Sequence, residues 1–201
     1  MGTKKIILAA LFSFLLFVRS TCKKNCTTSS YSFELDVKVY PANDTLSIGD
    51  TLWFEVNNST QLKDLQSGQL IDYSNAENLG SAIAFNRLSS SNSFTEKAVN
   101  KFNYVLEFGR ETKSVDLELL KEFIFSEQSN KYIFLLGIIT KEKGTYSIIF
   151  SNAGNVFRKN DKCTKAGFAI NIENRDRHPY LNPSYTGGVY PPGGDYYFVV
   201  K

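Results

Sequence analysis

The segment YSFELDVKVY, residues 31–40, decides the fold class of this chain. Apolar and aromatic side chains occupy every second position, and the positions between them include Glu34, Asp36 and Lys38. A period of two over ten residues is typical of a strand with one face in a core and the other in solvent. The segment therefore predicts a half-buried β-strand.

Further strands are predicted along the rest of the chain, one after the Gly-Asp turn at 49–50 and others at residues 69–73, 81–88, 103–108, 131–140, 145–150, 167–172 and 196–200. Residues 131–140 (KYIFLLGIIT) form a nearly continuous apolar run, which is typical of a central strand covered on both faces. The turn at 141–144 predicts that this strand pairs with 145–150 as a hairpin. The polar residues 57–67 predict a loop. The 16 Phe and 11 Tyr of the chain also favour strands over helices.

Residues 114–125 (SVDLELLKEFIF) fit two patterns. The apolar side chains at 115, 117 and 119 alternate as in a strand, whereas those at 117, 120, 123 and 124 recur at helical spacing behind Ser114, a candidate N-cap. We favour a strand because the neighbouring segments are predicted strands.

Two short phrases resemble those of immunoglobulin-like domains. In residues 46–56 a Gly-Asp turn precedes a strand with an aromatic residue, and residues 143–146 (KGTY) resemble a corner at which a Tyr hydrogen-bonds back to the main chain. Together with the many short predicted strands, they predict an all-β, immunoglobulin-like β-sandwich as a single domain over residues 31–201. Within it, the Pro/Gly/Tyr-rich residues 174–195 predict an ordered loop or an exposed arm.

The first 21 residues have the layout of a secretory signal peptide. Lys4 and Lys5 precede an apolar run at 6–18 that only Ser13 interrupts. This run is shorter than the ~20 residues of a membrane-spanning helix. Residues 22–30 are mostly small and polar, which suits a tether between the cleavage site and the fold. The sequence predicts that the mature protein lies outside the cytoplasm.

Residues 20–25 (STCKKN) resemble the lipoprotein signals of Bacteroidota. The resemblance implies that Cys22 is lipidated and that the protein is anchored to the cell envelope, at the periplasmic or surface face of the outer membrane. Arg19 departs from the pattern, in which an aliphatic residue stands three positions before the Cys. The alternative is an ordinary signal peptide cut after Ser20, which would give a soluble secreted protein.

The chain has three cysteines, Cys22, Cys26 and Cys163. An odd number of thiols is unusual in an oxidising compartment. If Cys22 is lipidated, Cys26 and Cys163 remain to form a disulfide, which would close a loop that the chain-entropy model credits with roughly 4–5 kcal/mol.

The charge balance argues against a nucleic-acid partner. Without residues 1–21, Lys plus Arg falls from 23 to 20, which equals the 20 Asp plus Glu. Nucleic-acid binders need a concentrated basic face.

Candidate catalytic residues are few. The single His, His178, lies in the loop-rich tail, and a Ser or Cys nucleophile needs a base within reach. The acids show no calcium-loop spacing, and Asp116 with Glu118 is a pair common on exposed strands. We expect no enzyme activity, metal or other cofactor, and interpret the chain as a binding or structural module.

Tyrosines in the tail are the candidate ligand-binding residues. Tyr180, Tyr185 and Tyr190 lie among Gly and Pro, where flat aromatic rings could stack on sugars or pack against a protein. The alternative is that the tail tyrosines cover an open end of the sandwich. A carbohydrate-binding accessory protein that uses these tyrosines is therefore the second hypothesis for function, and a protein or glycan partner is left open.

Overall fold

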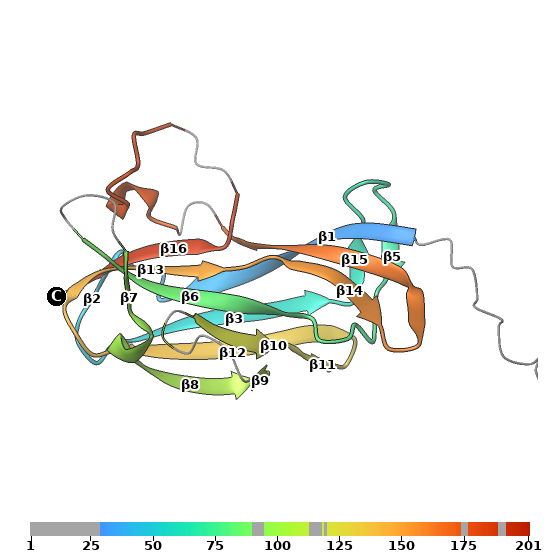
Figure 1. Ribbon diagram of the computed structural model, residues 1–201, viewed down its shortest axis with the longest axis horizontal. Helices are drawn as coiled ribbons and strands as arrows, with labels where there is room; N and C mark the ends of the chain where they lie inside the picture. Colours follow the sequence, from blue (N-terminus) through green and yellow to red (C-terminus); the bar gives the residue numbers. More distant parts are fainter. Residues whose placement is uncertain (1–28, 90–94, 113–117, 119, 174–176, 189–191) are drawn as a thin grey trace, which may run out of the picture.

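Two seven-stranded β-sheets pack against each other in the computed structural model, which describes residues 29–89, 95–112, 118, 120–173, 177–188 and 192–201 (Figure 1). The predicted all-β sandwich is confirmed. Within the described ranges the only helical turns are the 3₁₀ segments η1 (Val99–Lys101) and η3 (Pro179–Leu181). No helix in this described part is long and apolar enough to cross a membrane.

The first sheet has the strand order β11-β12-β3-β1-β15-β14, and β8 also pairs with β12. Its central pair, β1 and β15, is parallel, and its other pairs are antiparallel. The strands are β1 (Ser29–Tyr40), β3 (Thr51–Ser59), β8 (Phe102–Phe108), β11 (Ser126–Gln128), β12 (Lys131–Thr140), β14 (Ala153–Arg158) and β15 (Asp161–Ile172).

The second sheet has the order β2-β16-β13-β6-β10-β9, and β7 also pairs with β6. Its strands are β2 (Thr45–Leu46), β6 (Gly80–Leu88), β7 (Thr95–Lys97), β9 (Arg110–Glu111), β10 (Leu120–Ile124), β13 (Gly144–Phe150) and β16 (Asp195–Val200). A separate hairpin, β4 (Gln61–Lys63) and β5 (Leu70–Asp72), stands at the end of the sandwich where β1 begins (Figure 1).

The core lies between the two sheets and is rich in aromatic side chains. The alternation in β1 is realised as predicted, because Phe33, Leu35, Val37 and Val39 are buried and the residues between them are exposed. Rings from both sheets meet in the core, for example Phe54 and Phe150, whose centroids are 5.4 Å apart. Burial of these inward faces is the main force that holds the two sheets together.

The predicted hairpin between 131–140 and 145–150 is wrong. Strand β12 pairs with β3, β8 and β11 in the first sheet, whereas β13 pairs with β6 and β16 in the second. The intervening turn therefore carries the chain from one sheet to the other. The corner predicted for residues 143–146 is present, since Tyr146 Oη donates a hydrogen bond of 3.0 Å to the Glu142 carbonyl. Both strands bury apolar side chains in the same core, which a sandwich achieves by placing them in opposite sheets.

Other predictions are corrected in detail. Residues 57–67 are not simply a loop, because β3 continues to Ser59 through main-chain pairing with β12, and β4 follows. Strand β14 was not predicted, since its sequence AGNVFR lacks alternation. In the ambiguous segment, residues 120–124 form a strand, and residues 113–117 and 119 lie outside the described residues.

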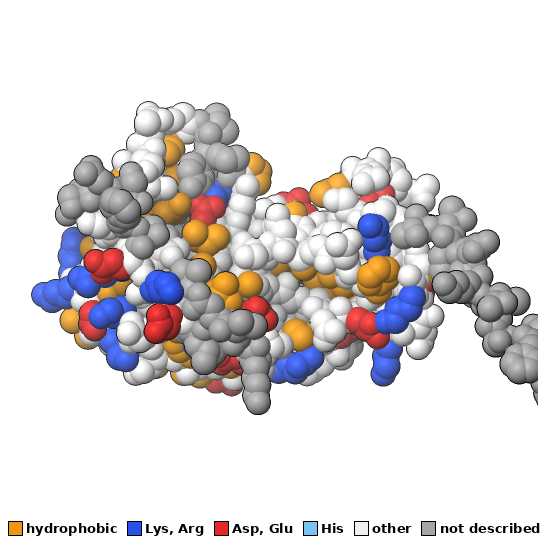
Figure 2. Space-filling model, in the orientation of Figure 1, with side chains coloured by type: hydrophobic (Ala, Val, Ile, Leu, Met, Phe, Trp, Pro, Cys, Tyr) orange, Lys and Arg blue, Asp and Glu red, His pale blue; other side chains and the backbone are white. Residues whose placement is uncertain are grey.

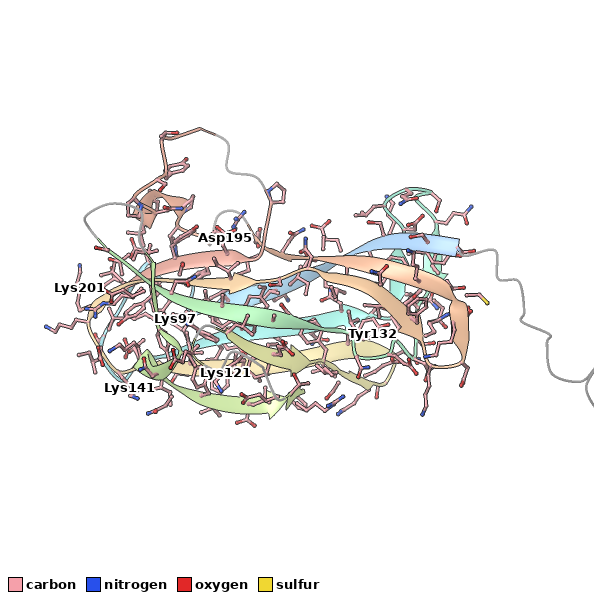
Figure 3. All side chains as sticks on the ribbon, in the orientation of Figure 1. Lys97, Lys121, Tyr132, Lys141, Asp195 and Lys201 are labelled. Atoms are coloured by element: carbon pink, nitrogen blue, oxygen red, sulfur yellow. The ribbon has the colours of Figure 1, made fainter. Side chains whose placement is uncertain are left out.

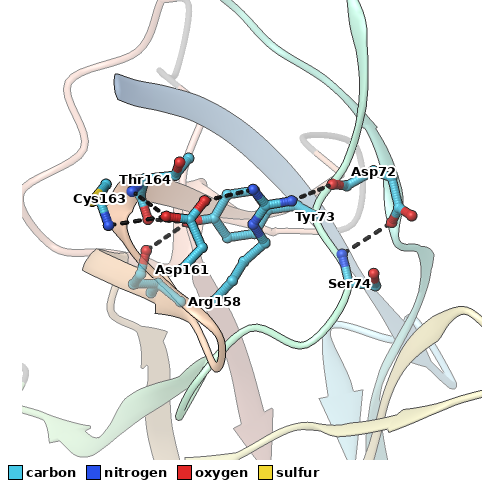
Figure 4. A network of polar contacts seen from close by, with 8 residues as sticks. Asp72, Tyr73, Ser74, Arg158, Asp161, Cys163 and Thr164 are labelled. Atoms are coloured by element: carbon cyan, nitrogen blue, oxygen red, sulfur yellow. Dashed lines mark hydrogen bonds and ion pairs between the residues drawn. The ribbon is translucent and has the colours of Figure 1, made fainter. Parts of the chain in front are cut away.

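A polar network closes the end of the sandwich beside the start of β1 (Figure 4). Tyr132 Oη donates to the Tyr73 carbonyl, and Tyr73 Oη donates to the Val156 carbonyl at 2.8 Å. Burial raises the pKa of Tyr73 to about 12, which keeps this phenol protonated as a donor. The Arg158 guanidinium lies over the Tyr73 ring, 5.5 Å from its centroid.

The same network extends to the turn between β14 and β15. Arg158 pairs with Asp161 at 2.7 Å, and Asp161 accepts hydrogen bonds from the main-chain N–H groups of Cys163 and Thr164 (Figure 4). Hydrogen bonds from Thr164, Arg158 and Cys163 hold the pKa of Asp161 well below its usual range. The backbone around Cys163 is thus held in a defined position.

Candidate binding groove

The tail tyrosines engage groups within the chain. Tyr180 Oη donates to the Asp44 carboxylate at 2.7 Å, and Tyr185 Oη donates to the Gly188 carbonyl at 2.8 Å. The hydrogen bond to Asp44, together with burial, raises the pKa of Tyr180 to about 12. Tyr190 lies outside the described residues. These contacts give Tyr180 and Tyr185 a role in shaping the loop, although Tyr180 is still 57% exposed.

The rest of the described tail is held against β16. The ring of His178 packs edge-on against Tyr196, with centroids 5.3 Å apart, and Nδ1 lies 3.1 Å from the Tyr197 carbonyl oxygen. Tyr196 and Tyr197 are themselves buried. This part of the tail therefore packs against β16.

The residues considered for catalysis do not form a site in the described structure. Asp116 lies outside the described residues, and Glu118, whose side chain is 83% exposed, lies 3.7 Å from Lys97 Nζ. The described residues contain no cluster of three His, Cys, Asp or Glu that could hold a metal. Cys22 and Cys26 also lie outside the described residues, while Cys163 is in β15.

A groove of about 710 Å³ lies on the outer face of the first sheet, over β1 and β15. The alternation that buries one face of β1 turns its polar residues outward into this groove, and the parallel pairing places Asp36 opposite Asn171 of β15. Its polar and aromatic lining consists of Glu34, Asp36, Lys38, Tyr40, Asn171 and Glu173, and Pro192 also lines it.

Acidic groups dominate the electrostatics of the groove. Burial raises the pKa of Asp36, and the negative charges of Glu34 and Glu173 raise it further, while Lys38 opposes the shift. Asn171 Nδ2 donates a hydrogen bond to Glu34 Oε1, which orients that carboxylate along the strand pair. The groove therefore presents several oriented oxygen acceptors.

One end of the groove carries an aromatic surface. Tyr40 of β1 pairs with Trp53 of β3, and the two rings lie 6.5 Å apart with an interplanar angle of 19°. Trp53 pairs in turn with Gly137 of β12. A Cβ on Gly137 would meet three indole carbons at 2.8–3.0 Å, so the indole lies flat over the glycine. We call Tyr40 and Trp53 the aromatic platform.

The chemistry of the groove suits binding. Its lining contains carboxylates, an amide, an amine and an aromatic ring, all of which can hydrogen-bond or stack with a ligand, and no His, Cys, Ser or Thr. Rigid aromatic surface beside convergent hydrogen-bonding groups is characteristic of ligand sites.

Sequence reasoning missed this site because it considered aromatic residues in the tail. The alternation in 31–40 does place Tyr40 on the same face as Glu34 and Asp36, and the burial of Phe54 implies that Trp53 faces outward. The pairing of Tyr40 with Trp53, however, depends on the strand order.

No protein-family model and no curated protein sequence matches this chain. Solved structures that match include the second type II cohesin module of the ScaA scaffoldin from Acetivibrio cellulolyticus, at 8% identity and a TM-score of 0.34, over 69% of this chain and 92% of that one. A type II cohesin dyad from the same scaffoldin matches at 13% identity and a TM-score of 0.30, over 73% of this chain and 47% of that one.

The CupB6 tip adhesin from Pseudomonas aeruginosa matches at 13% identity and a TM-score of 0.21, over 74% of this chain and 42% of the adhesin. This chain thus spans less than half the length of the dyad and of the adhesin. Because the structural similarity to these proteins is low, the function of this chain has to be inferred from its own residues.

Proposed function

We propose that this protein is a non-catalytic binding module of the cell envelope, exported by residues 1–21, lipid-anchored at Cys22 in the outer membrane, and binding its ligand in the groove over β1 and β15. The observation that carries the binding role is the groove itself, in which oriented polar groups adjoin the aromatic platform. Its lining contains no His, Cys, Ser or Thr.

The geometry of the sandwich is compatible with an anchor at Cys22. Ser29 begins β1 at one end of the sandwich, and the C-terminus lies at the opposite end (Figure 1). The segment from Cys22 to Ser29 can span at most about 25 Å when extended. The groove lies along the later part of β1, from Glu34 to Tyr40, so an anchored protein would keep it away from the membrane.

A disulfide between Cys26 and Cys163 belongs to the same proposal. The parallel register places Ser29 opposite Thr164, the residue after Cys163. Cys26 precedes Ser29 by only three residues, a separation of about 10 Å in an extended chain. This reach is compatible with a bridge that fastens the tether to β15.

The surface charge is consistent with a partner other than nucleic acid. On the face drawn in Figure 2, basic and acidic side chains are interspersed over the sandwich. The acidic groove on the outer face of the first sheet would repel phosphate groups.

The anchor is tested by the intact mass of the mature protein recovered from its native envelope. We expect the mass of a chain that begins at Cys22 and carries two or three acyl chains. A Cys22→Ser variant should lose the lipid, whereas the matched Cys26→Ser variant should keep it. An unlipidated chain beginning at Thr21 would refute the anchor and favour the soluble secreted protein.

A further inference from the structure

We infer that the groove over β1 and β15 binds a carbohydrate chain, with a sugar ring stacked on the aromatic platform of Tyr40 and Trp53. The inference rests on the proposed function, because it names the ligand class of the same groove. It assigns the stacking role to Tyr40 and Trp53, which the fold brings together from two neighbouring strands, in place of the tail tyrosines.

The platform is held in place before any ligand arrives. Trp53 is partly buried and its indole lies flat on Gly137, where no side chain lifts it from the sheet. Tyr40 lies beside it with a nearly parallel ring and is 40% exposed. A flat, fixed apolar surface of this kind matches the C–H face of a sugar ring and loses little conformational entropy on binding.

The polar groups of the groove match the hydroxyls of a sugar chain. Glu34, Asp36 and Tyr40 project from the same face of β1, so successive outward positions are about 6.6–6.8 Å apart along the strand. Carboxylates accept hydrogen bonds from hydroxyl donors, and Lys38 and the Asn171 amide can donate to hydroxyl oxygens. A glycan lying along β1 would thus meet acceptors at one end of the groove and the platform at the other.

The position of β1 argues against a peptide bound as an added strand. Strand β1 lies between β3 and β15, and its main-chain groups are paired with these neighbours. Addition of a peptide strand requires an open sheet edge. The groove lies on a sheet face, where recognition depends on side chains.

The chain contains a single Trp, so its fluorescence reports directly on the platform. The experiment titrates the mature protein with a fixed panel of soluble glycans: xylan, galactomannan, laminarin, glycogen and peptidoglycan fragments. We expect a saturable change in Trp53 emission with at least one of them, and retardation of the protein in a gel that contains the same glycan.

Two variants locate the binding. Tyr40→Ala removes half of the platform from an exposed position, and Gly137→Ala displaces the indole without changing the identity of any groove side chain. Each should weaken glycan binding at least tenfold. The matched control is Tyr180→Ala, which removes another exposed tyrosine from outside the groove and should bind like the parent.

The outcomes separate this inference from the proposed function. If no glycan of the panel changes the emission or retards the protein, the carbohydrate assignment is refuted, while a lipidated Cys22 would still support an envelope module. If a glycan binds and both Tyr40→Ala and Gly137→Ala bind it like the parent, the assignment of the binding site to the aromatic platform is refuted. Should Gly137→Ala fail to fold, Tyr40→Ala alone decides, because its side chain is outside the core.

Discussion

Arg177 and Asp195 form an ion pair at the base of the C-terminal loop segment, with only 2% and 16% of their side chains exposed (Figure 3 labels Asp195). Arg177 Nε also donates to the Asp195 carbonyl at 3.0 Å. The Arg177 carbonyl in turn accepts a hydrogen bond from the Tyr197 N–H. These contacts join the start of residues 177–188 to the start of β16.

Truncation of this arginine should destabilise the protein strongly. Arg177→Ala removes the cation that pairs with the largely buried Asp195 carboxylate, and breaking a buried ion pair in this way costs about 3–5 kcal/mol. Urea unfolding of parent and variant measures the loss. The control is Arg110→Ala, at an exposed position where the guanidinium donates a hydrogen bond of 3.3 Å to Asn78 Oδ1, for which we expect a change within ~0.5 kcal/mol. Equal effects of the two substitutions would contradict a structural role for the pair.

The proposed disulfide predicts specific thiol chemistry. In the mature chain Cys26 and Cys163 should be alkylated only after reduction and unfolding. Cys163→Ser should lower the free energy of unfolding by roughly 4–5 kcal/mol, because the bridge closes a long loop in the unfolded chain. Cys26→Ser should cost the same, and the double variant no more than either single one, since all three remove one bond. Alkylation of both thiols in the unreduced protein would refute the bridge.

Asp64 should contribute to the acid sensitivity of the protein. It accepts hydrogen bonds from the Ser32 N–H at 2.9 Å and from the Ser67 hydroxyl at 2.7 Å, and these lower its pKa to about 2. An Asp in the unfolded chain has a pKa of about 3.9. The pKa of Asp64 is lower in the folded than in the unfolded chain. The ionised carboxylate therefore stabilises the folded state fully above about pH 4, and this stabilisation is lost as the pH falls towards 2.

Thermal unfolding of Asp64→Asn between pH 2 and pH 7 tests this linkage. The variant should unfold at a lower temperature than the parent at pH 7, and the difference should shrink towards pH 2. Glu118→Gln, at an exposed position, is the control and should follow the parent throughout. A pH-independent difference for Asp64→Asn would show that its titration does not contribute.

The tyrosine corner can be separated from the packing of its ring. Tyr146→Phe removes the hydrogen bond to the Glu142 carbonyl and keeps the ring contacts with Phe102 and Phe198. We expect a loss of about 0.5–1.5 kcal/mol, as for a typical hydrogen bond. Tyr146→Ala also empties part of the core and should cost about 3–5 kcal/mol. Unfolding in guanidinium chloride distinguishes the two, and equal losses would contradict the assignment.

Much of the secondary structure could be predicted because its cause is local. In 31–40 the alternation reflects one buried and one exposed face, and in 167–172 buried residues alternate with partly buried ones; both segments are strands. Strand β14 was missed because it lies at the edge of its sheet, where fewer of its side chains are buried and alternation is weak.

The pairing of strands could not be read from the same patterns. The short turn at 141–144 favoured a hairpin, but β12 and β13 lie in opposite sheets, and the hydrogen bond from Tyr146 to the Glu142 carbonyl holds the turn between them. Contacts that decide between these arrangements come from strands distant in sequence, such as β3 and β6.

By itself the sequence determined the all-β class, the inward face of each strongly alternating strand, and the expectation of export and lipidation that its first 26 residues carry. Only the tertiary structure decided which residues share a surface. Tyr40, Trp53 and Gly137 come from three strands, of which the third is distant from the other two along the chain, and they meet because β1, β3 and β12 are neighbours in one sheet. Side-chain periodicity is a local property, whereas sheet neighbours are chosen by the packing of the whole core.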